Sequence, residues 1–481
     1  MPETRSSTGP DWTWRLAWVV LAALYVSALL FNGIEHYQVL LLVLALPAAV
    51  LAGSSTRAGV ILVAGSPALD SYAIIATEPQ VVTVFQVVLV SALMGALWRL
   101  TRARKPRVAR ITIWDVGIVL FLAAAAVSVP LSVDVRGSVI GTIEIAALTG
   151  MYLFLSRAVR EAAVWSDVFY AVVLTSGASA LVAIGQAFLA HPPVPLLEHH
   201  LTGSPVVAER VSGYFANPNS LALMLLLGVI LLAEAIIRDD SVARRIGFAV
   251  LGLICVIALA FTFSREAIVG LVVGGVALLL MSALTARARS WSLAALAVVF
   301  VAVLAFPGVH ERAASVLDIR SDPSAMDRVY LSEVSLRMFA DHPLTGIGMS
   351  SFMAAYPRYA DPRVTIDPVP NGHQMPFSIP AETGVLGLLA ELLMVGALVL
   401  GVRAAPRLAK AGMRIAGVAA AIAFFAMSFA NGFWFCEAFW TTLALVGAVF
   451  RTAPLGPALL LEGGSVRVGR VDDARLSRGD R

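Results

Sequence analysis

Charged residues are scarce in this chain. Only 14% of its 481 residues are Asp, Glu, Lys or Arg, whereas 59% are hydrophobic. Soluble globular proteins carry about a quarter of charged residues, so this composition excludes an ordinary soluble domain. The formal net charge of +4 does not indicate nucleic-acid binding, because the basic residues form short clusters between apolar runs. Such clusters are typical topology signals of membrane proteins.

Cysteine is nearly absent too. Cys255 and Cys436 are the two cysteines, and both lie in or beside apolar runs. This excludes a disulfide framework and a CxxC metal site. Walker A, HExxH and dinucleotide-binding fingerprints are also missing. The apolar runs do not alternate as membrane strands do, so a β-barrel is excluded.

Long apolar runs are what the chain does have. Runs of roughly 16 to 25 residues recur from Trp14 to Val449, and about 20 helical residues cross a bilayer core. We therefore predict an all-α, polytopic helical membrane protein with about 12–14 transmembrane helices and one large external loop. The run 58–76 contains Pro67 and Asp70, which predicts a broken or partly inserted span.

Basic loops orient the predicted helices. The loops Arg99–Arg110 and Arg403–Arg414 contain no acidic residue and are predicted to face the cytoplasm. The two longest polar connections, about 191–217 and 307–378, then face outward. The predicted segments are a cytoplasmic N-terminus (1–13), a transmembrane bundle (14–306), the large external loop (307–378), C-terminal transmembrane helices (379–450) and a disordered cytoplasmic tail (451–481).

Arg265 is a candidate functional residue because it is wedged between two apolar runs, in FTFSREAIVG. A charge that faces lipid costs about 2.5–3.5 kcal/mol on insertion scales, so this side chain is expected to face a polar cavity or a partner. The alternatives are that it pairs with Glu266 or caps a helix end. Neighbours at i and i+1 do not face each other on a helix, which weakens the pairing alternative.

Arg210 precedes a turn, Asn217-Pro218-Asn219-Ser220, that opens the next apolar run. The turn predicts a helix N-terminus with Asn219 or Ser220 as the cap, whose dipole would point at an anion. Asn217 and Asn219 are therefore supporting candidates beside Arg210. The alternative for Arg210 is an interfacial anchor whose head group reaches into water.

His373 lies at the end of the large loop, at the same outer boundary as the two arginines. Neighbouring positive charges disfavour protonated imidazole, which leaves a neutral base that can accept a proton. The alternative is ordinary polar surface. Arg328 and Glu382 are supporting candidates, and Glu382 is expected to orient His373 or to hold an arginine. His342 is expected to end a helix before a glycine turn.

A metal site is disfavoured by the positions of the acidic residues. The adjacent acidic pairs Asp239-Asp240 and Asp472-Asp473 are both predicted to be cytoplasmic, and no cofactor is expected. The acids inside apolar runs are candidates by default. Structural roles are favoured for most of them: Glu144, Glu234, Glu391 and Glu437.

The order of these motifs resembles the O-antigen ligase and polymerase superfamily of bacterial membrane glycan transferases. The matching stretches are RVSGYFANPNSLA (Arg210 to Ala222), TFSREAIVGL (Thr262 to Leu271), DHPLTGIGMSSF (Asp341 to Phe352) and AETGVLGLL (Ala381 to Leu389), with Arg328 and His373 between them. The family commonly has His-Asn-x-x-Leu at the histidine, whereas this chain has His373-Gln374-Met375-Pro376-Phe377.

The resemblance implies an inverting, metal-independent glycosyltransferase in the inner membrane, with its active site facing outward. It is also compatible with a GT-C-like architecture. It implies that a glycan moves from an undecaprenyl-pyrophosphate carrier to a hydroxyl of a glycan or lipid acceptor. Arg210 and Arg265 would then bind pyrophosphate, and His373 would be the general base. Membrane lipids, but no nucleic acid, are expected as further partners.

Two other functions remain open from the sequence. A transporter or flippase of lipid-linked glycans would have inverted repeats and broken helices in corresponding halves. A scaffold for an envelope synthesis complex would need no charge at Arg265. Ligase and polymerase are not distinguished, since they can share a donor site and differ in the acceptor.

Overall fold

The computed structural model describes most of the chain. The described ranges are 11–31, 37–69, 74–76, 82–102, 110–159, 162–189, 210–215, 217–304, 323–365, 372–410 and 414–452. Helices make up 84% of this structure, so the predicted all-α fold class is confirmed. The predicted N-terminal segment 1–13 and the tail 451–481 lie almost entirely outside the described residues.

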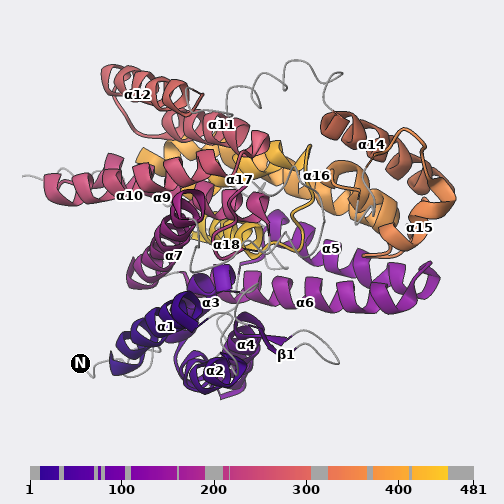
Figure 1. Cartoon of the computed structure of the whole chain (residues 1–481), viewed down its shortest axis with the longest axis horizontal. Coiled ribbons are helices and arrows are strands. Elements are labelled where there is room, and N and C mark those ends of the chain that lie inside the picture. The colour runs from indigo at the N-terminus through magenta and orange to yellow at the C-terminus, as the bar shows by residue number, and fades with distance from the viewer. Residues whose placement is uncertain are drawn as a thin grey trace, which may run out of the picture.

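The helices follow the apolar runs of the sequence (Figure 1). The N-terminal part contains α1 (Asp11–Phe31), α2 (Tyr37–Ser54), α3 (Thr56–Gly65), α4 (Val84–Arg102), α5 (Ile113–Ser128), α6 (Val135–Ala158) and α7 (Ala162–Phe188). The C-terminal part contains α9 (Pro218–Arg238), α10 (Val242–Phe261), α11 (Arg265–Met281), α12 (Ala286–Leu304), α14 (Pro323–Asp341), α15 (Phe352–Tyr359), α16 (Met375–Lys410), α17 (Ala416–Ser428) and α18 (Glu437–Thr452). The short elements are η1 (Pro67–Leu69), η2 (Val129–Leu131) and the antiparallel strands β1 (Ile74–Ala76) and β2 (Val82–Thr83).

Eight described helices are long and apolar enough to cross a membrane. They are Trp12–Leu30, Val84–Arg102, Ile113–Leu131, Val135–Ala158, Ala163–Phe188, Pro218–Arg238, Val242–Phe261 and Met375–Ala409. Shorter apolar helices occupy other predicted runs, and the total of about 12–14 spans stays a prediction. In the run 58–76, α3 ends at Gly65 before the turn η1, in agreement with the predicted break.

Contacts between helix ends gather the basic segments at one end of the bundle, which we call the basic end. Arg57 forms an ion pair with Asp167 at 2.7 Å, which joins the first turn of α3 to the second turn of α7. Arg451, in the last turn of α18, forms a buried ion pair with Asp115 in the first turn of α5. Tyr152 near the end of α6 donates to the same carboxylate at 2.7 Å. These contacts agree with the side that the basic loops predict for each helix.

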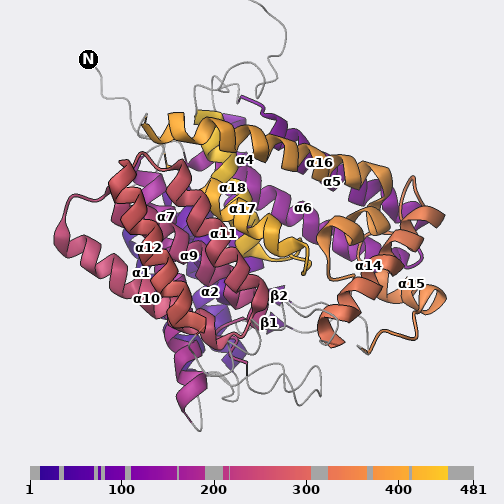
Figure 2. The same ribbon diagram turned by 90° about the horizontal axis from the view of Figure 1, so that it is seen from above.

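The opposite end carries residues 323–365, which we call the loop subdomain. It holds α14 and α15 and extends beyond the bundle beside α16 (Figures 1 and 2). Its own small core is made by buried apolar side chains: Leu331, Val334, Met338, Ile347, Phe352, Ala355 and Ala381. The last of these belongs to α16, so the subdomain shares its core with the bundle.

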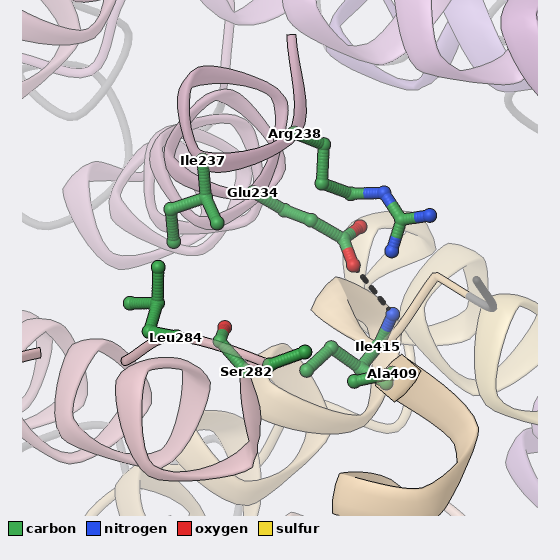
Figure 3. Close-up of a pocket in the computed structure, with 8 residues that line it drawn as sticks. Glu234, Ile237, Arg238, Ser282, Leu284, Ala409 and Ile415 are labelled. Carbon is green, nitrogen blue, oxygen red and sulfur yellow. Dashed lines mark hydrogen bonds between the residues drawn. The ribbon is translucent and has the colours of Figure 1, made fainter. Parts of the chain in front are cut away.

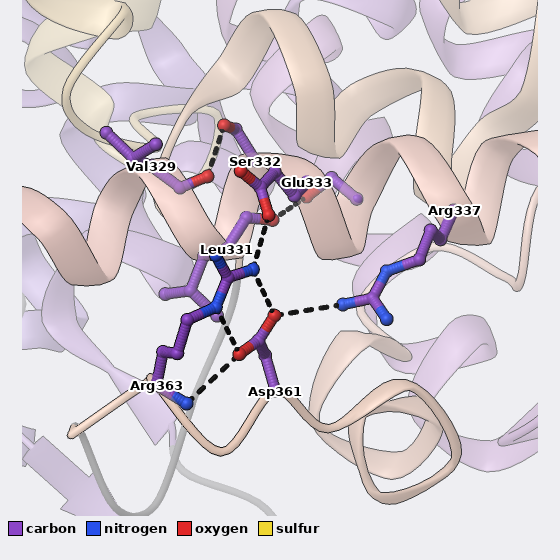
Figure 4. Close-up of polar contacts among 8 residues, drawn as sticks. Val329, Leu331, Ser332, Glu333, Arg337, Asp361 and Arg363 are labelled. Carbon is purple, nitrogen blue, oxygen red and sulfur yellow. Dashed lines mark hydrogen bonds and ion pairs between the residues drawn. The ribbon is translucent and has the colours of Figure 1, made fainter.

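An ion-pair network holds the last segment of the loop subdomain against α14 (Figure 4). Arg363 contacts Asp361 at 2.8 Å and Glu333 at 2.6 Å, while Arg337 reaches Asp361 at 3.5 Å. The hydrogen bond from Arg363 holds the pKa of Asp361 far below its ordinary value. Arg363 also lies over the ring of Tyr330, with 4.2 Å from its guanidinium carbon to the ring centre.

Helix α16 breaks at Gly384, whose φ of 68° and ψ of −160° are outside the helical region. The break interrupts main-chain hydrogen bonds of the helix, and the turn after α14 replaces them. Ile347 N donates to Ala381 O at 2.9 Å, and Val385 N donates to Pro343 O at 2.8 Å. The turn and the broken helix therefore complete each other's backbone hydrogen bonding.

Glycines are required where the turn meets the break. A Cβ at Gly346, whose φ is +68°, would lie 2.3 Å from the carbonyl carbon of Glu382. A Cβ at Gly384 would lie 2.3 Å from the carbonyl oxygen of Leu344. The prediction that Gly346 shapes a turn after a helix ending near His342 is confirmed, since α14 ends at Asp341.

Candidate active site

Arg210 is tied to the turn that joins α10 to α11. Its Nε donates to the carbonyl of Thr262 at 2.8 Å, and a terminal guanidinium nitrogen donates to Asn219 Oδ1 at 2.9 Å. Beside it, Val211 N donates to Phe261 O at 3.3 Å. A planar guanidinium can make these two directed bonds and still present further N–H groups to a ligand.

The N-cap of α9 differs from the predicted one. Asn217 is the cap, and its side chain accepts from Ser220 N at 2.9 Å. The prediction of Asn219 or Ser220 as the cap is wrong, because Pro218 takes the first helical position that its fixed φ favours. Asn219 is thereby released to bind Arg210.

Arg265 is the first residue of α11. Ser264 is the N-cap and accepts from Ala267 N at 3.4 Å, while Phe263 has a left-handed φ of 48° that turns the chain sharply after α10. Arg265 is only 8% exposed. The carbonyl of Thr262 accepts a hydrogen bond from Arg210, and Ser264 caps the helix that begins with Arg265. The turn Thr262–Ser264 thus connects the two arginines.

Glu266 does not form the local pair with Arg265 that the sequence left open as an alternative. Its carboxylate forms an ion pair with Arg328 at 2.6 Å and accepts from Ser264 Oγ at 3.1 Å. Glu266 is 6% exposed, and Arg328 comes from α14 of the loop subdomain. This ion pair joins the loop subdomain to the start of α11. Sequence analysis missed Glu266 as a site residue because its partner lies in a distant segment.

Arg328 is held in place from its own helix as well. The neighbouring Asp327 is buried and accepts from both Thr365 N and Thr365 Oγ1 at 2.7 Å. These two bonds fix the end of the loop subdomain to the start of α14, where Arg328 projects toward Glu266.

His373 precedes α16 and has a left-handed φ of 56°. Histidine adopts this conformation more readily than most residues, and such conformations gather at functional sites. Gly372 before it lies against the loop subdomain, since a Cβ there would be 2.9 Å from both Phe352 and Ser335. Ser378 N and Ser378 Oγ both donate to the carbonyl of Gln374, which secures the first turn of α16 behind His373.

The electrostatic surroundings of His373 favour its neutral form. Burial lowers the pKa of His373 to about 4, and the positive charge of Arg328 lowers it as well. The charges of Glu266 and Asp327 and a hydrogen bond with Asn431 act in the opposite direction. His373, Arg328 and Glu266 are therefore close enough to influence each other's charge. At neutral pH this imidazole can accept a proton.

Asn431 is a second site residue that sequence analysis missed. It lies in the connection between α17 and α18, is 8% exposed and hydrogen-bonds with the side chain of His373. The next residue, Gly432, approaches the same place, because a Cβ there would lie 3.3 Å from the carbonyl of His373. The only sequence signal was a short Asn-Gly break between two apolar runs, which is also the signal of an ordinary turn.

Glu382 binds the turn of the loop subdomain. Its carboxylate accepts from Ser350 N at 2.9 Å, and Glu382 is 2% exposed. The described contacts thus give Glu382 a role in holding the turn, in place of the expected contact with His373 or an arginine. Among the described residues, no group of three His, Cys, Asp or Glu side chains is placed to hold a metal ion.

A family model described as O-antigen ligase matches residues 249–392. This match supports the resemblance of the chain to the O-antigen ligase and polymerase superfamily. A comparison with curated proteins gives no match.

The O-antigen ligase match begins within α10 and ends within α16. It includes Arg265, Arg328 and His373, whereas Arg210 and Asn431 contribute from outside it. The chain is therefore an integral membrane protein that contains a region similar to O-antigen ligases.

Proposed function

We propose that the protein is a glycosyltransferase that moves a glycan from an undecaprenyl-pyrophosphate carrier to a hydroxyl of a lipid or polysaccharide acceptor. The site would face outward from the inner membrane. The observation that carries the proposal is the hydrogen bond from Arg210 to the turn that begins α11 with Arg265. Ser264 of the same turn binds Glu266, which forms an ion pair with Arg328. The charge of Arg328 in turn helps to keep His373 neutral.

Arg210 and Arg265 are the proposed ligands of the pyrophosphate. Guanidinium groups match phosphate oxygens with paired N–H donors, and the bonds are stronger when both partners are charged. The N-terminus of α11 adds the positive end of a helix dipole beside Arg265. As the glycan leaves, negative charge grows on the pyrophosphate, and these donors stabilise it. This charge stabilisation needs no metal ion.

His373 is the proposed general base. The acceptor oxygen attacks the anomeric carbon as its proton passes to the imidazole of His373. The bond from the anomeric carbon to the pyrophosphate oxygen breaks, and its electron pair leaves with the carrier lipid. A direct displacement of this kind inverts the anomeric configuration. Arg328 supports the base by disfavouring its protonated form.

The test is reconstitution of the purified protein with undecaprenyl-pyrophosphate-linked glycan and a panel of acceptors. His373→Ala is expected to lower the transfer rate by about 10²–10⁴-fold, the usual contribution of a general base. His342→Ala is the matched control, because it removes a histidine of the loop subdomain that ends a helix. Full transfer by His373→Ala would contradict the assignment. Product length separates the two acceptor classes, since a polymerase builds a ladder of repeats and a ligase stops after one transfer.

A further inference from the structure

A second polar cavity lies at the basic end of the bundle, away from the candidate active site. Its volume is about 260 Å³, and it lies where α9, α11 and α16 end and α17 begins (Figure 3). Helix α11 separates it from Arg265, and 17 helical residues span about 25 Å. The cavity is therefore independent of the proposed transfer chemistry.

The cavity contains a buried carboxyl group. Glu234 is 3% exposed, and its carboxylate accepts from Ile415 N at 2.6 Å. The C-terminal ends of α9 and α11 reach the same cavity through Arg238 and Ser282. Because helix C-termini carry partial negative charge, the interior favours a cation.

Positive charge surrounds this interior. Arg238 is exposed, and Figure 3 shows its guanidinium beside the carboxylate of Glu234. Arg414 interacts electrostatically with Glu234 as well, and it lies over the ring of Trp165 at 5.5 Å. A ligand that enters here meets the guanidinium group of Arg238 and the carboxyl group of Glu234. This arrangement is complementary to a zwitterion that has a phosphate and an ammonium group.

The walls and the size of the cavity point to the head of a lipid. Ile237, Leu284 and Ile415 line it with aliphatic carbon. Sites for drug-sized ligands have about 300–1,000 Å³, so this smaller cavity suits a head group whose acyl chains remain in the bilayer. Basic pockets between transmembrane helices at the cytoplasmic side are known recognition sites for phospholipid head groups.

We propose that this cavity binds the phosphoethanolamine head group of a membrane phospholipid. The ammonium donates to Glu234, and the phosphate accepts from Arg238. Phosphatidylcholine fits poorly, because its trimethylammonium group has no N–H to donate. Phosphatidylglycerol offers the phosphate but no cation for Glu234.

The proposal is tested by native mass spectrometry of the delipidated full-length protein, titrated with three phospholipids that share the same acyl chains. Phosphatidylethanolamine is expected to bind about tenfold more tightly than phosphatidylcholine or phosphatidylglycerol, a difference of about 1.4 kcal/mol. Glu234→Gln is expected to abolish this preference, because Gln keeps the acceptor oxygen for Ile415 N but has no charge. Asp240→Asn is the matched control, since it removes an exposed negative charge that does not line the cavity.

Thermal unfolding in detergent shows whether Glu234→Gln folds. If it does not fold, two further variants test the proposal. Arg238→Gln removes a phosphate donor, and Ala409→Leu fills the cavity without changing its charge. Both are expected to weaken phosphatidylethanolamine binding about tenfold or more. Equal binding of the three lipids by the wild type, or unchanged selectivity in these variants, would overturn the proposal. Equal competition by soluble glycerophosphoethanolamine would show that the site takes the free head group and not the lipid.

Discussion

Arg210 donates its Nε–H to the carbonyl oxygen of Thr262 at 2.8 Å. The bond joins the segment before α9 to the turn between α10 and α11. It fixes the orientation of one guanidinium relative to the helix that begins with Arg265. The two arginines are thus positioned by the same turn. A substitution of either one is expected to weaken binding of the same ligand group.

Arginine-to-lysine exchange tests this geometry. A lysine at position 210 has one nitrogen and cannot bond to Thr262 and Asn219 while it also presents a flat pair of donors to phosphate. Arg210→Lys and Arg265→Lys are each expected to lose about 10²–10³-fold in transfer rate, close to the alanine variants. The measurement is turnover and donor binding in reconstituted protein. Arg337→Lys, on the exposed side of the loop subdomain, is the control and should behave as wild type. Wild-type donor binding by both site variants would refute the pyrophosphate assignment.

The pH profile reports the charge state of His373. Because its pKa is lowered to about 4, His373 stays neutral down to acidic pH, and the acid limb of the activity profile should lie near pH 4. An unperturbed histidine would place that limb near pH 6.5. Arg328→Gln is expected to move the limb to higher pH, since it removes a positive neighbour and leaves Glu266 without its ion-pair partner. An acid limb near pH 6.5 in the wild type would show that His373 is not held neutral during turnover.

Asn431 should act as a positioning residue for His373. Its hydrogen bond raises the pKa of His373, so Asn431→Ala is expected to shift the acid limb to lower pH, opposite to Arg328→Gln. The variant should also lose about tenfold in kcat with little change in KM, because the base loses orientation and the donor ligands are untouched. Asn431→Gln should restore part of the rate. Identical pH profiles for wild type and Asn431→Ala would mean that the residue is structural.

The glycines at the break in α16 are expected to control stability. Gly384→Ala places a side chain on a left-handed φ and against the backbone of Leu344, and it should destabilise the protein by about 1–3 kcal/mol or more. Thermal unfolding in detergent measures the effect. Gly247→Ala is a matched control in α10, because nothing lies within 4 Å of the added Cβ. Ala is the better helix former by about 1 kcal/mol, so this control should be neutral or stabilising.

Much of this arrangement follows from simple patterns in the sequence. Apolar run length predicts the helices, and the distribution of Lys and Arg predicts which end of each helix is basic. Together they predict that Arg210, Arg265 and His373 lie at the opposite end, and the contacts of the described residues bring these segments close to one another. The motif order then indicates the superfamily, which the family match confirms.

The rest depends on contacts between distant segments. Glu266 appeared to be a local alternative partner of Arg265, and only the packing of the loop subdomain shows that it pairs with Arg328. Asn431 stands in a short Asn-Gly break between two apolar runs, which looks like any short connection. The cap of α9 was misassigned because local propensity does not show that Asn219 is taken by Arg210.

The break at Gly384 divides the site between two parts of the molecule, the loop subdomain and the main bundle, whose sequences can change separately. His373 directly precedes the short helical segment before the break, beside Gly372, which packs on the loop subdomain, whereas the arginines belong to the main bundle. Replacement or remodelling of the loop subdomain can therefore alter which acceptor meets the base while the carrier lipid still meets the same arginines. Under the proposed function, the acceptor side of the site can thus change separately from the donor side.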